Sequence, residues 1–199
     1  MTTSTAATTT ATKVALITGG NRGLGLATGR LLGRAGATIV IAARDEQRSH
    51  EAVVALRSED IRASAVQVDV DEPAGIAAAV QRVTRDHGRL DILVNNAGIL
   101  PEATTPDADR PLDLNLFTRT LHTNVLGAVA VTQAFLPLLT ASGAGRIVNV
   151  SSTMGSLSDQ LNPDSPYFGT VLPAYQTSKA ALNGLTIALS RRWPTPRSR

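Results

Sequence analysis

The sequence predicts an α/β fold, a doubly wound parallel sheet of the Rossmann-like kind. Two observations lead to this prediction: short apolar runs alternate with longer helical stretches, and a glycine-rich segment directly follows the first apolar run. Strands that are buried on both faces read as continuous apolar runs, and helices between them force parallel crossover connections. Ligands of such sheets bind at the carboxyl ends of the strands, so these ends are where functional residues are expected.

The elements follow one another in order from residue 13. The expected strands are short and apolar, and they cover residues 14–17, 38–42, 64–68, 91–94 and 146–150. The expected helices are longer, and they cover residues 24–35, 45–58, 73–87, 112–140 and 174–189. Pro73 suits the first turn of the third helix. No internal repeat and no second domain is visible in the sequence.

We interpret residues 13–190 as a single dinucleotide-binding and catalytic domain. Residues 1–12 are almost entirely Thr, Ala and Ser without apolar periodicity, which is typical of a disordered tail. This segment lacks the basic start and apolar middle of a secretory signal. Residues 191–199 have neither an apolar period nor a strand pattern, and we expect an irregular basic tail there.

The composition excludes several classes of protein. With 43% hydrophobic and 18% charged residues among 199, the chain is globular. No apolar run approaches the roughly 18 residues of a membrane span, so we expect no membrane association. The absence of cysteine removes disulfides, thiolate metal sites and a cysteine nucleophile. Three scattered histidines (His50, His87 and His122) do not indicate a metal site, and we expect a cytoplasmic protein.

The basic pI of 9.9 does not indicate nucleic-acid binding. The formal net charge is only +3, and the last nine residues alone contain four arginines. The rest of the chain is therefore close to neutral. Because nucleic-acid-binding domains present a basic stripe on one face, we expect no nucleic-acid partner.

The glycine-rich segment at residues 18–25 reads Thr-Gly-Gly-Asn-Arg-Gly-Leu-Gly. Glycines at a strand-to-helix turn allow tight backbone angles, and the helix that follows presents free N–H groups to a phosphate. A plain tight turn is the alternative, but the position between a strand and a helix favours a dinucleotide site. The expected cofactor-binding residues here are Gly19, Asn21, Arg22, Gly23, Leu24 and Gly25.

The end of the second strand bears on the choice between NAD and NADP. An acidic residue there would bind the ribose 2′-hydroxyl, whereas an arginine accommodates a 2′-phosphate. The chain has Ala43 where the acid is expected, followed by Arg44, and Arg22 adds a second positive charge. Both arginines can alternatively be solvated surface charges, and Asp45 argues for NAD(H). The sequence favours NADP(H) over NAD(H).

Tyr175 and Lys179 are four residues apart in the last expected helix, so they share one face. A phenol has an unperturbed pKa near 10 and is a poor acid–base catalyst at neutral pH. A neighbouring ammonium favours the phenolate, which suits a tyrosine to proton transfer. An ordinary exposed helix pair is the alternative. A serine at the end of the fifth strand can hydrogen-bond a substrate carbonyl, and both Ser151 and Ser152 stand there.

Five ordered motifs make the chain similar to the short-chain dehydrogenase/reductase family over residues 13 to about 190. They are the glycine turn at 18–25, Asn-Asn-Ala-Gly at 95–98, the asparagine at 124, Val-Asn-Val-Ser-Ser at 148–152 and Tyr-x-x-x-Lys at 175–179. The resemblance implies four catalytic residues, which are Asn124, Ser152, Tyr175 and Lys179. It also implies further cofactor contacts, from Asp69 and Val70 at the adenine, from Asn96, Ala97 and Gly98 at the ribose and nicotinamide, and from Tyr175 and Lys179.

Several of these roles have alternatives. Ser152 is chosen because the family's catalytic serine is usually the second of such a pair, with Ser151 as the alternative. The resemblance implies that Asn124 holds a water that links Lys179 to solvent; alternatively it is a structural amide that bonds the backbone at a helix irregularity. Asp69 is alternatively a cap for the next helix.

The resemblance implies an NADP(H)-dependent, carbonyl-reductase-like oxidoreductase that interconverts a carbonyl and a secondary alcohol by hydride transfer, with Tyr175 as acid and base. Its partner is then a small ketone, aldehyde or alcohol. It implies either a monomer or a homo-oligomer that pairs through the long helix and the Tyr175 helix. The segment 153–172 is longer than in compact family members, and we expect it to form a loop over the cleft.

The chain stops where the family continues with a further strand, a helix and a final strand. We therefore expect a C-terminally truncated member, less stable and slower than an extended version. A dinucleotide-binding fragment or pseudoenzyme without turnover is the alternative function.

Overall fold

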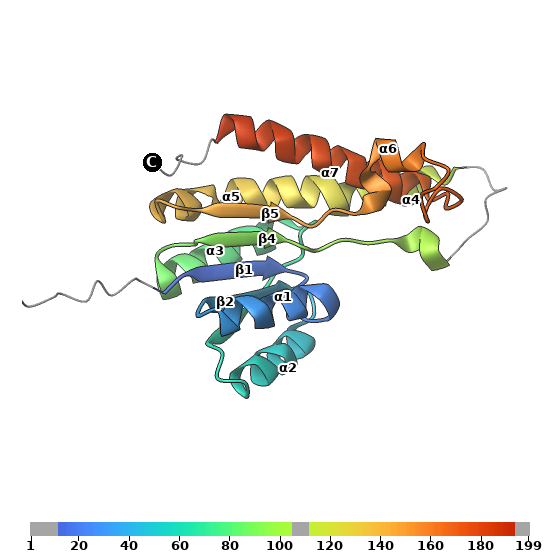
Figure 1. Ribbon diagram of the computed structural model, residues 1–199. Helices are drawn as coiled ribbons and strands as arrows, with labels where there is room; N and C mark the ends of the chain where they lie inside the picture. The colour runs from blue at the N-terminus through green and yellow to red at the C-terminus, as the bar shows by residue number, and fades with distance from the viewer. Residues whose placement is uncertain (1–11, 105–111, 194–199) are drawn as a thin grey trace, which may run out of the picture.

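The computed structural model describes residues 12–104 and 112–193 (Figure 1). Most of the expected N-terminal tail and the end of the expected basic tail lie outside these residues, so both tails stay predictions. The structure places five strands in one sheet, with the bounds β1 Val14–Thr18, β2 Thr38–Ala43, β3 Ala63–Gln67, β4 Ile92–Asn95 and β5 Arg146–Asn149. Every expected strand is thus present.

The sheet has the order β3-β2-β1-β4-β5 and every pairing is parallel. Leu16 of β1, for example, lies opposite Val40 of β2 and Leu93 of β4. The chain adds strands outward from β1 to β3 and then returns to place β4 on the other side of β1. The carboxyl ends of β1 and β4 therefore form the switch point at which such sheets bind ligands. The predicted doubly wound parallel sheet is confirmed.

Helices cover both faces of the sheet, as Figure 1 shows. On one face lie α1 Gly23–Arg34 and α2 Glu46–Arg57; on the other lie α3 Pro73–His87 and α5 Gly127–Ala141. At the β5 edge lies α7 Pro173–Arg192. The remaining elements are η1 Pro101–Thr104, α4 Leu114–Leu121, η2 His122–Leu126, η3 Thr153–Gly155 and α6 Leu157–Gln160.

The hydrophobic core consists of two layers, because successive strand residues point to opposite faces. In β1, Leu16 packs in the layer with Phe135 of α5, whereas Ile17 packs in the layer with Leu56 of α2. All four side chains are fully buried. Burial on both faces explains why the strands are continuous apolar runs in the sequence.

Two helices differ from their predicted form. The expected helix 112–140 is a helical stretch that a π-helix, η2, divides into α4 and α5. The last helix continues beyond the expected residue 189 to Arg192, so Arg191 and Arg192 are helical rather than part of an irregular tail. Within the expected loop 153–172, the structure contains the short helices η3 and α6. Its placement over the cleft stays a prediction.

The stretch Leu114–Ala141 is long and apolar enough, by length and composition, to cross a membrane. Polar residues such as Arg119 and Asn124 interrupt its apolar runs in the sequence. In the fold its α5 part packs against the sheet through Val131, Phe135, Leu138 and Leu139. A core helix passes the same length and hydropathy test, so the stretch is weak evidence for a span.

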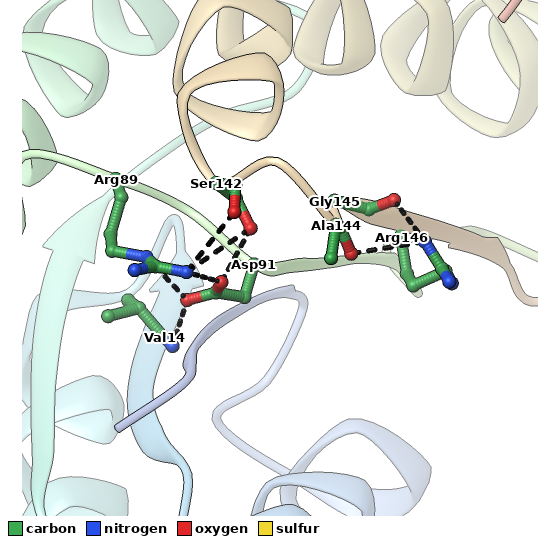
Figure 2. A network of polar contacts seen from close by, with 7 residues as sticks. All are labelled: Val14, Arg89, Asp91, Ser142, Ala144, Gly145 and Arg146. Atoms are coloured by element: carbon green, nitrogen blue, oxygen red, sulfur yellow. Dashed lines mark hydrogen bonds and ion pairs between the residues drawn. The ribbon is translucent and has the colours of Figure 1, made fainter. Parts of the chain in front are cut away.

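The amino ends of the strands are joined by a buried carboxylate, that of Asp91 (Figure 2). Its Oδ2 accepts from the backbone N–H of Val14 at 2.8 Å, and its Oδ1 accepts from the Ser142 hydroxyl. Arg89 donates to both carboxylate oxygens. Burial alone raises the pKa of Asp91, but these hydrogen bonds and the arginine charge outweigh it and hold the pKa below its ordinary value. Asp91 thus ties β1 and the end of α5 to β4.

Candidate active site

The turn between β1 and α1 is built around glycine. Gly19 and Gly23 have φ values of +60° and +52°, in the left-handed region that glycine adopts without steric cost. A Cβ on Gly25 would lie 2.6 Å from both the Asn96 Nδ2 atom and the Gly19 carbonyl oxygen. The turn therefore needs glycine for its backbone conformation and for its close approach to the segment after β4.

The Asn-Asn-Ala-Gly segment is bound to this turn. Asn96 Nδ2 donates to the carbonyl oxygens of Thr18 and Gly19 at 2.9 and 3.1 Å. The Thr18 hydroxyl accepts from the backbone N–H groups of Asn96 and Ala97, both at 3.0 Å. Asn95 points the other way, and its Nδ2 donates to Thr132 and Asn149. The two adjacent asparagines therefore have different tasks: Asn96 shapes the turn and Asn95 joins elements of the interior.

An open groove of about 440 Å³ lies beside this turn, at the carboxyl ends of the strands. Twelve of the expected cofactor-binding residues border it: Gly19, Asn21, Arg22, Gly23, Leu24, Gly25, Arg44, Asp69, Val70, Asn96, Ala97 and Gly98. The other bordering residues are Ala43, Asp45, Arg48, Val68, Ile99 and Thr123. Two further expected contacts, Tyr175 and Lys179, are outside this set.

One end of the groove is rich in arginine, with Arg22, Arg44 and Arg48 on its border. Asp45 is the N-cap of α2: its side chain accepts from the backbone N–H of Arg48 at 2.9 Å. The Arg48 guanidinium also lies 3.3 Å from the Asp45 carboxylate. The Asp45 carboxylate, whose acidity favoured NAD(H), is therefore already hydrogen-bonded as the cap of α2. Arg48 was not among the residues expected at the site; it lies in the first turn of α2, three residues after the cap Asp45.

Asp69 does not cap the next helix. Its Oδ1 accepts from the backbone N–H of Asp71 at 3.1 Å, and its Oδ2 lies 3.7 Å from the Arg44 guanidinium. The residue before α3 is Glu72, which makes no side-chain capping bond. The alternative that Asp69 is a helix cap is therefore wrong.

Asn124 is buried in the π-helix η2, where its amide bonds the backbone. Its Oδ1 accepts from the Ile99 N–H at 2.8 Å, and its Nδ2 donates to the Ile99 carbonyl and to the Ser178 hydroxyl, both at 3.0 Å. These contacts fit the structural alternative for Asn124, a backbone-bonding amide at a helix irregularity. They also join the segment after β4 to α7.

Tyr175 and Lys179 share a face of α7, with the Lys179 Nζ 5.6 Å from the centre of the tyrosine ring. Lys179 is 5% exposed, and its ammonium donates to the Val150 carbonyl at 2.8 Å. Burial lowers the pKa of Lys179 below its ordinary value. Within the described residues, the Tyr175 hydroxyl makes no hydrogen bond, which leaves it available to a ligand.

The two serines after β5 differ in their contacts. Ser151 donates to the Lys179 carbonyl at 3.4 Å, a long bond. Ser152 caps η3, because its Oγ accepts from the Met154 N–H at 3.2 Å. A Cβ on Gly155 would lie 2.7 Å from the Lys179 backbone, so η3 packs tightly against α7. In this arrangement the Ser152 hydroxyl keeps its own proton to donate.

Three residues that organise the site were missed in the sequence. Thr18 and Ser178 bond the motif residues, and Glu102 bonds the backbone at the start of α7. Thr18 and Ser178 stand inside the glycine turn and the Tyr-x-x-x-Lys segment, which is a signal for them. Glu102 stands in an irregular stretch without such a signal.

The comparisons with known proteins identify the family of the chain. The family model described as short chain dehydrogenase matches residues 13–196. A short-chain dehydrogenase/reductase of Aspergillus fumigatus is 36% identical over 89% of this chain and 67% of its own length. Carbonyl reductase [NADPH] 1 of Mus musculus is 41% identical over 70% of this chain and 48% of its own length.

Solved structures give the same result. A crystal structure of an actinorhodin polyketide ketoreductase with NADPH superimposes with a TM-score of 0.76 at 32% identity, over 91% of this chain and 65% of that one. The family match and the solved structures support an oxidoreductase with a Rossmann-like domain. The chain belongs to the short-chain dehydrogenase/reductase family. It spans about two thirds of the Aspergillus relative and of the ketoreductase, and about half of the mouse carbonyl reductase.

Proposed function

We propose that this protein is an NADP(H)-dependent oxidoreductase that interconverts a ketone or aldehyde and an alcohol by hydride transfer. The observation that supports this best is the pairing of two features in one fold. They are a glycine-lined groove with three arginines at one end, and a buried lysine beside a tyrosine whose hydroxyl is free within the described residues. The first suits a phosphorylated dinucleotide, and the second suits proton transfer.

The groove fits a dinucleotide because its backbone is open where phosphates must approach. The glycine turn presents the start of α1 to the groove, and a helix start attracts anions. We infer that Gly19, Asn21, Gly23, Leu24 and Gly25 hold the pyrophosphate, whereas Arg22 lies at the arginine-rich end of the groove. The adenine would lie by Asp69 and Val70, and the nicotinamide side by Asn96, Ala97 and Gly98. When bound, the nicotinamide supplies or accepts the hydride.

In reduction, the chain's own residues handle the carbonyl oxygen. The Tyr175 hydroxyl donates its proton to this oxygen as negative charge develops on it. Ser152 donates a hydrogen bond to the same oxygen and orients it. Lys179 keeps positive charge beside Tyr175 and binds the nicotinamide ribose. Asn124 binds the backbone at Ile99 beside them. We also propose that Asn124 holds a water molecule that links Lys179 to solvent.

A turnover assay tests the function directly. The purified chain is given NADPH and a panel of ketones and aldehydes, and the alcohol formed is measured against the NADPH consumed. We expect equal amounts of both for at least one substrate. Tight NADPH binding without turnover on any carbonyl would contradict the proposal and favour a dinucleotide-binding protein without catalysis.

The cofactor preference rests on Arg22, Arg44 and Arg48, which we propose surround the 2′-phosphate of NADPH. The carbonyl reductase of mouse is named for NADPH, and the ketoreductase structure contains it. Arg44→Asp removes one charge-assisted bond and adds repulsion, so we expect NADPH affinity to fall by about 10- to 100-fold. NADH affinity should change little. Titration of both nucleotides measures this.

Arg62→Asp is the matched control, because it makes the same charge reversal outside the groove. Arg62 is exposed and bonds the Gly36 carbonyl, far from the glycine turn along the strands. We expect it to leave both affinities unchanged. Tighter binding of NADH than NADPH to the parent chain would show that the proposed phosphate pocket is wrong.

Location and assembly stay proposals. We retain the cytoplasm as the location, and either a monomer or a homo-oligomer that pairs through the long helix and α7. Leu126 and Ile187, on these two stretches, are each 55% exposed, and such side chains are available for subunit contacts. Size-exclusion chromatography with light scattering distinguishes the two states.

A further inference from the structure

The helix that carries Tyr175 begins without a local cap. The residue before it is Leu172, which has no side-chain oxygen, and Pro173 occupies the first helical position. The first N–H groups of a helix have no partner within the helix, so they need acceptors from elsewhere. At α7 the acceptor comes from a segment about seventy residues earlier in the chain.

Glu102 of η1 supplies this cap with both carboxylate oxygens. Oε1 accepts from the Ala174 N–H at 3.0 Å, and Oε2 accepts from the Tyr175 N–H at 2.8 Å. A carboxylate suits this position, because an ionised acceptor makes strong hydrogen bonds and the start of a helix favours negative charge. One of the two bonds ends on Tyr175 itself, so no residue intervenes between Glu102 and the backbone of the proposed proton donor.

The backbone of Tyr175 is held on its other side as well. Its carbonyl oxygen accepts from the Ser178 hydroxyl at 2.7 Å, and Ser178 in turn accepts from Asn124. Asn124 also makes hydrogen bonds to the backbone N–H and carbonyl of Ile99, three residues before Glu102. The amide and the carbonyl of Tyr175 are therefore both connected to the stretch that follows β4.

This stretch is anchored at its beginning to the nucleotide groove. Asn96 is bound to the glycine turn, Ile99 to the π-helix, and Glu102 to α7. Figure 1 shows it running out beyond the sheet from β4 to η1, near the start of α7. Seven residues thus connect the groove border to the first turn of the Tyr175 helix.

We propose that Glu102 is a positioning residue, which fixes the first turn of α7 so that the Tyr175 hydroxyl stands at a set distance from the nucleotide groove. This rests on the proposed function, in which Tyr175 transfers the proton. Without Glu102 the uncapped turn can shift or fray, and Tyr175 is the third residue of that turn. A displacement of about 1 Å at a reacting group can cost about 100-fold in rate.

The test compares Glu102→Ala, Glu102→Gln and the parent chain. Ala removes both acceptors, whereas Gln keeps a carbonyl oxygen that can accept from the helix start. We expect Glu102→Ala to lower kcat for ketone reduction by about 10- to 100-fold. Glu102→Gln should recover only part of this, because its amide oxygen accepts from one N–H while its NH2 group cannot accept from the other. The Kd for NADPH should stay within about threefold, because the arginines and the glycine turn are unchanged. Rates are expressed per NADPH-binding molecule, so that a loss of folded protein does not lower the measured kcat.

Asp113→Ala is the matched control. Asp113 caps α4 in the same manner, accepting from the N–H groups of Asn115 and Leu116 at 2.9 and 3.1 Å, but within the described part of the chain it makes no hydrogen bond to Tyr175. This change should lower thermal stability without changing kcat. Amide hydrogen exchange gives a readout that does not depend on activity: Glu102→Ala should speed exchange at Ala174 and Tyr175, and Asp113→Ala should not.

Three results would overturn the proposal. Unchanged exchange at Ala174 and Tyr175 in Glu102→Ala would show that the carboxylate does not hold this turn. Faster exchange with an unchanged kcat would show that it holds the turn without positioning Tyr175. A parent chain without ketone turnover would instead overturn the proposed function and the positioning role with it, while the exchange rates would still report whether the cap exists.

Discussion

Tyr175→Phe is expected to lower kcat for ketone reduction by about 100- to 1000-fold, the size of effect that a positioned general acid supplies. The change removes only the hydroxyl, and that hydroxyl makes no hydrogen bond within the described residues, so the fold should be unaffected. The ring stays beside Lys179, and the Kd for NADPH should rise by no more than about tenfold, because one neutral hydrogen bond contributes about 0.5 to 1.5 kcal/mol. Steady-state kinetics and nucleotide titration measure the two quantities separately.

Tyr167→Phe is the control, because Tyr167 is the other tyrosine of the chain. It lies in the segment between α6 and α7 and is 42% exposed. The same loss of a hydroxyl there should leave kcat unchanged. If Tyr175→Phe reduces ketones as fast as the parent, Tyr175 is not the proton donor, and the reaction would need another acid.

The fold could be predicted from the sequence because buried strands and helix faces require apolar residues at positions that can be recognised in the sequence. A central strand such as β1 faces helices on both sides, so its first four residues are all apolar, and the run Val-Ala-Leu-Ile is visible without a structure. The glycine turn is visible for a similar reason: only glycine adopts φ near +60° at Gly19 and Gly23 without steric cost. Local constraints of this kind can be inferred from short segments.

The parts that were missed depend on contacts between distant segments. A helix irregularity at Asn124 was one of the two interpretations of that residue, but its form, a π-helix that widens one turn, is not marked by composition. Glu102 caps α7 from η1, and the only trace in the sequence is a helix that begins at Pro173 after a leucine, with no capping side chain. Asp45 shows the reverse case, since its acidic character suggested a ribose contact while its side chain is a helix cap.

In the candidate site, too, some features could be predicted from the sequence and others could not. The glycine turn, Asn96 and the arginine end all come from residues near strand ends, and parallel strands bring those ends to one edge. Their grouping in one groove therefore follows from the topology. The hydrogen bonds that orient Tyr175 and Lys179 depend on side-chain directions in irregular segments, which the pattern of apolar residues does not determine.

Asp91→Ala is expected to destabilise the fold by about 3 kcal/mol, the lower end of the range of free-energy losses when one partner of a buried ion pair is removed. The Asp91 side chain is 4% exposed, and its loss leaves the Arg89 guanidinium, the Ser142 hydroxyl and the Val14 N–H without this acceptor. Urea unfolding measures the change. Asp86→Asn is the control, because Asp86 also pairs with arginines, Arg82 and Arg85, but on the solvated face of α3. We expect little change from it.

The effect of Asp91 must also depend on pH, in a direction that its contacts determine. Its folded-state pKa lies below the ordinary value of 3.8, so its carboxylate stabilises the folded state fully above that value. This stabilisation is lost as the pH falls through the folded-state pKa, because protonation removes the charge that Arg89 pairs with. The difference in unfolding free energy between the parent and Asp91→Asn should therefore be constant from about pH 7 to pH 5 and narrow below about pH 4. A difference that widens on acidification would mean that burial outweighs the Arg89, Ser142 and Val14 bonds, and that Asp91 is protonated more easily in the fold than in the unfolded chain.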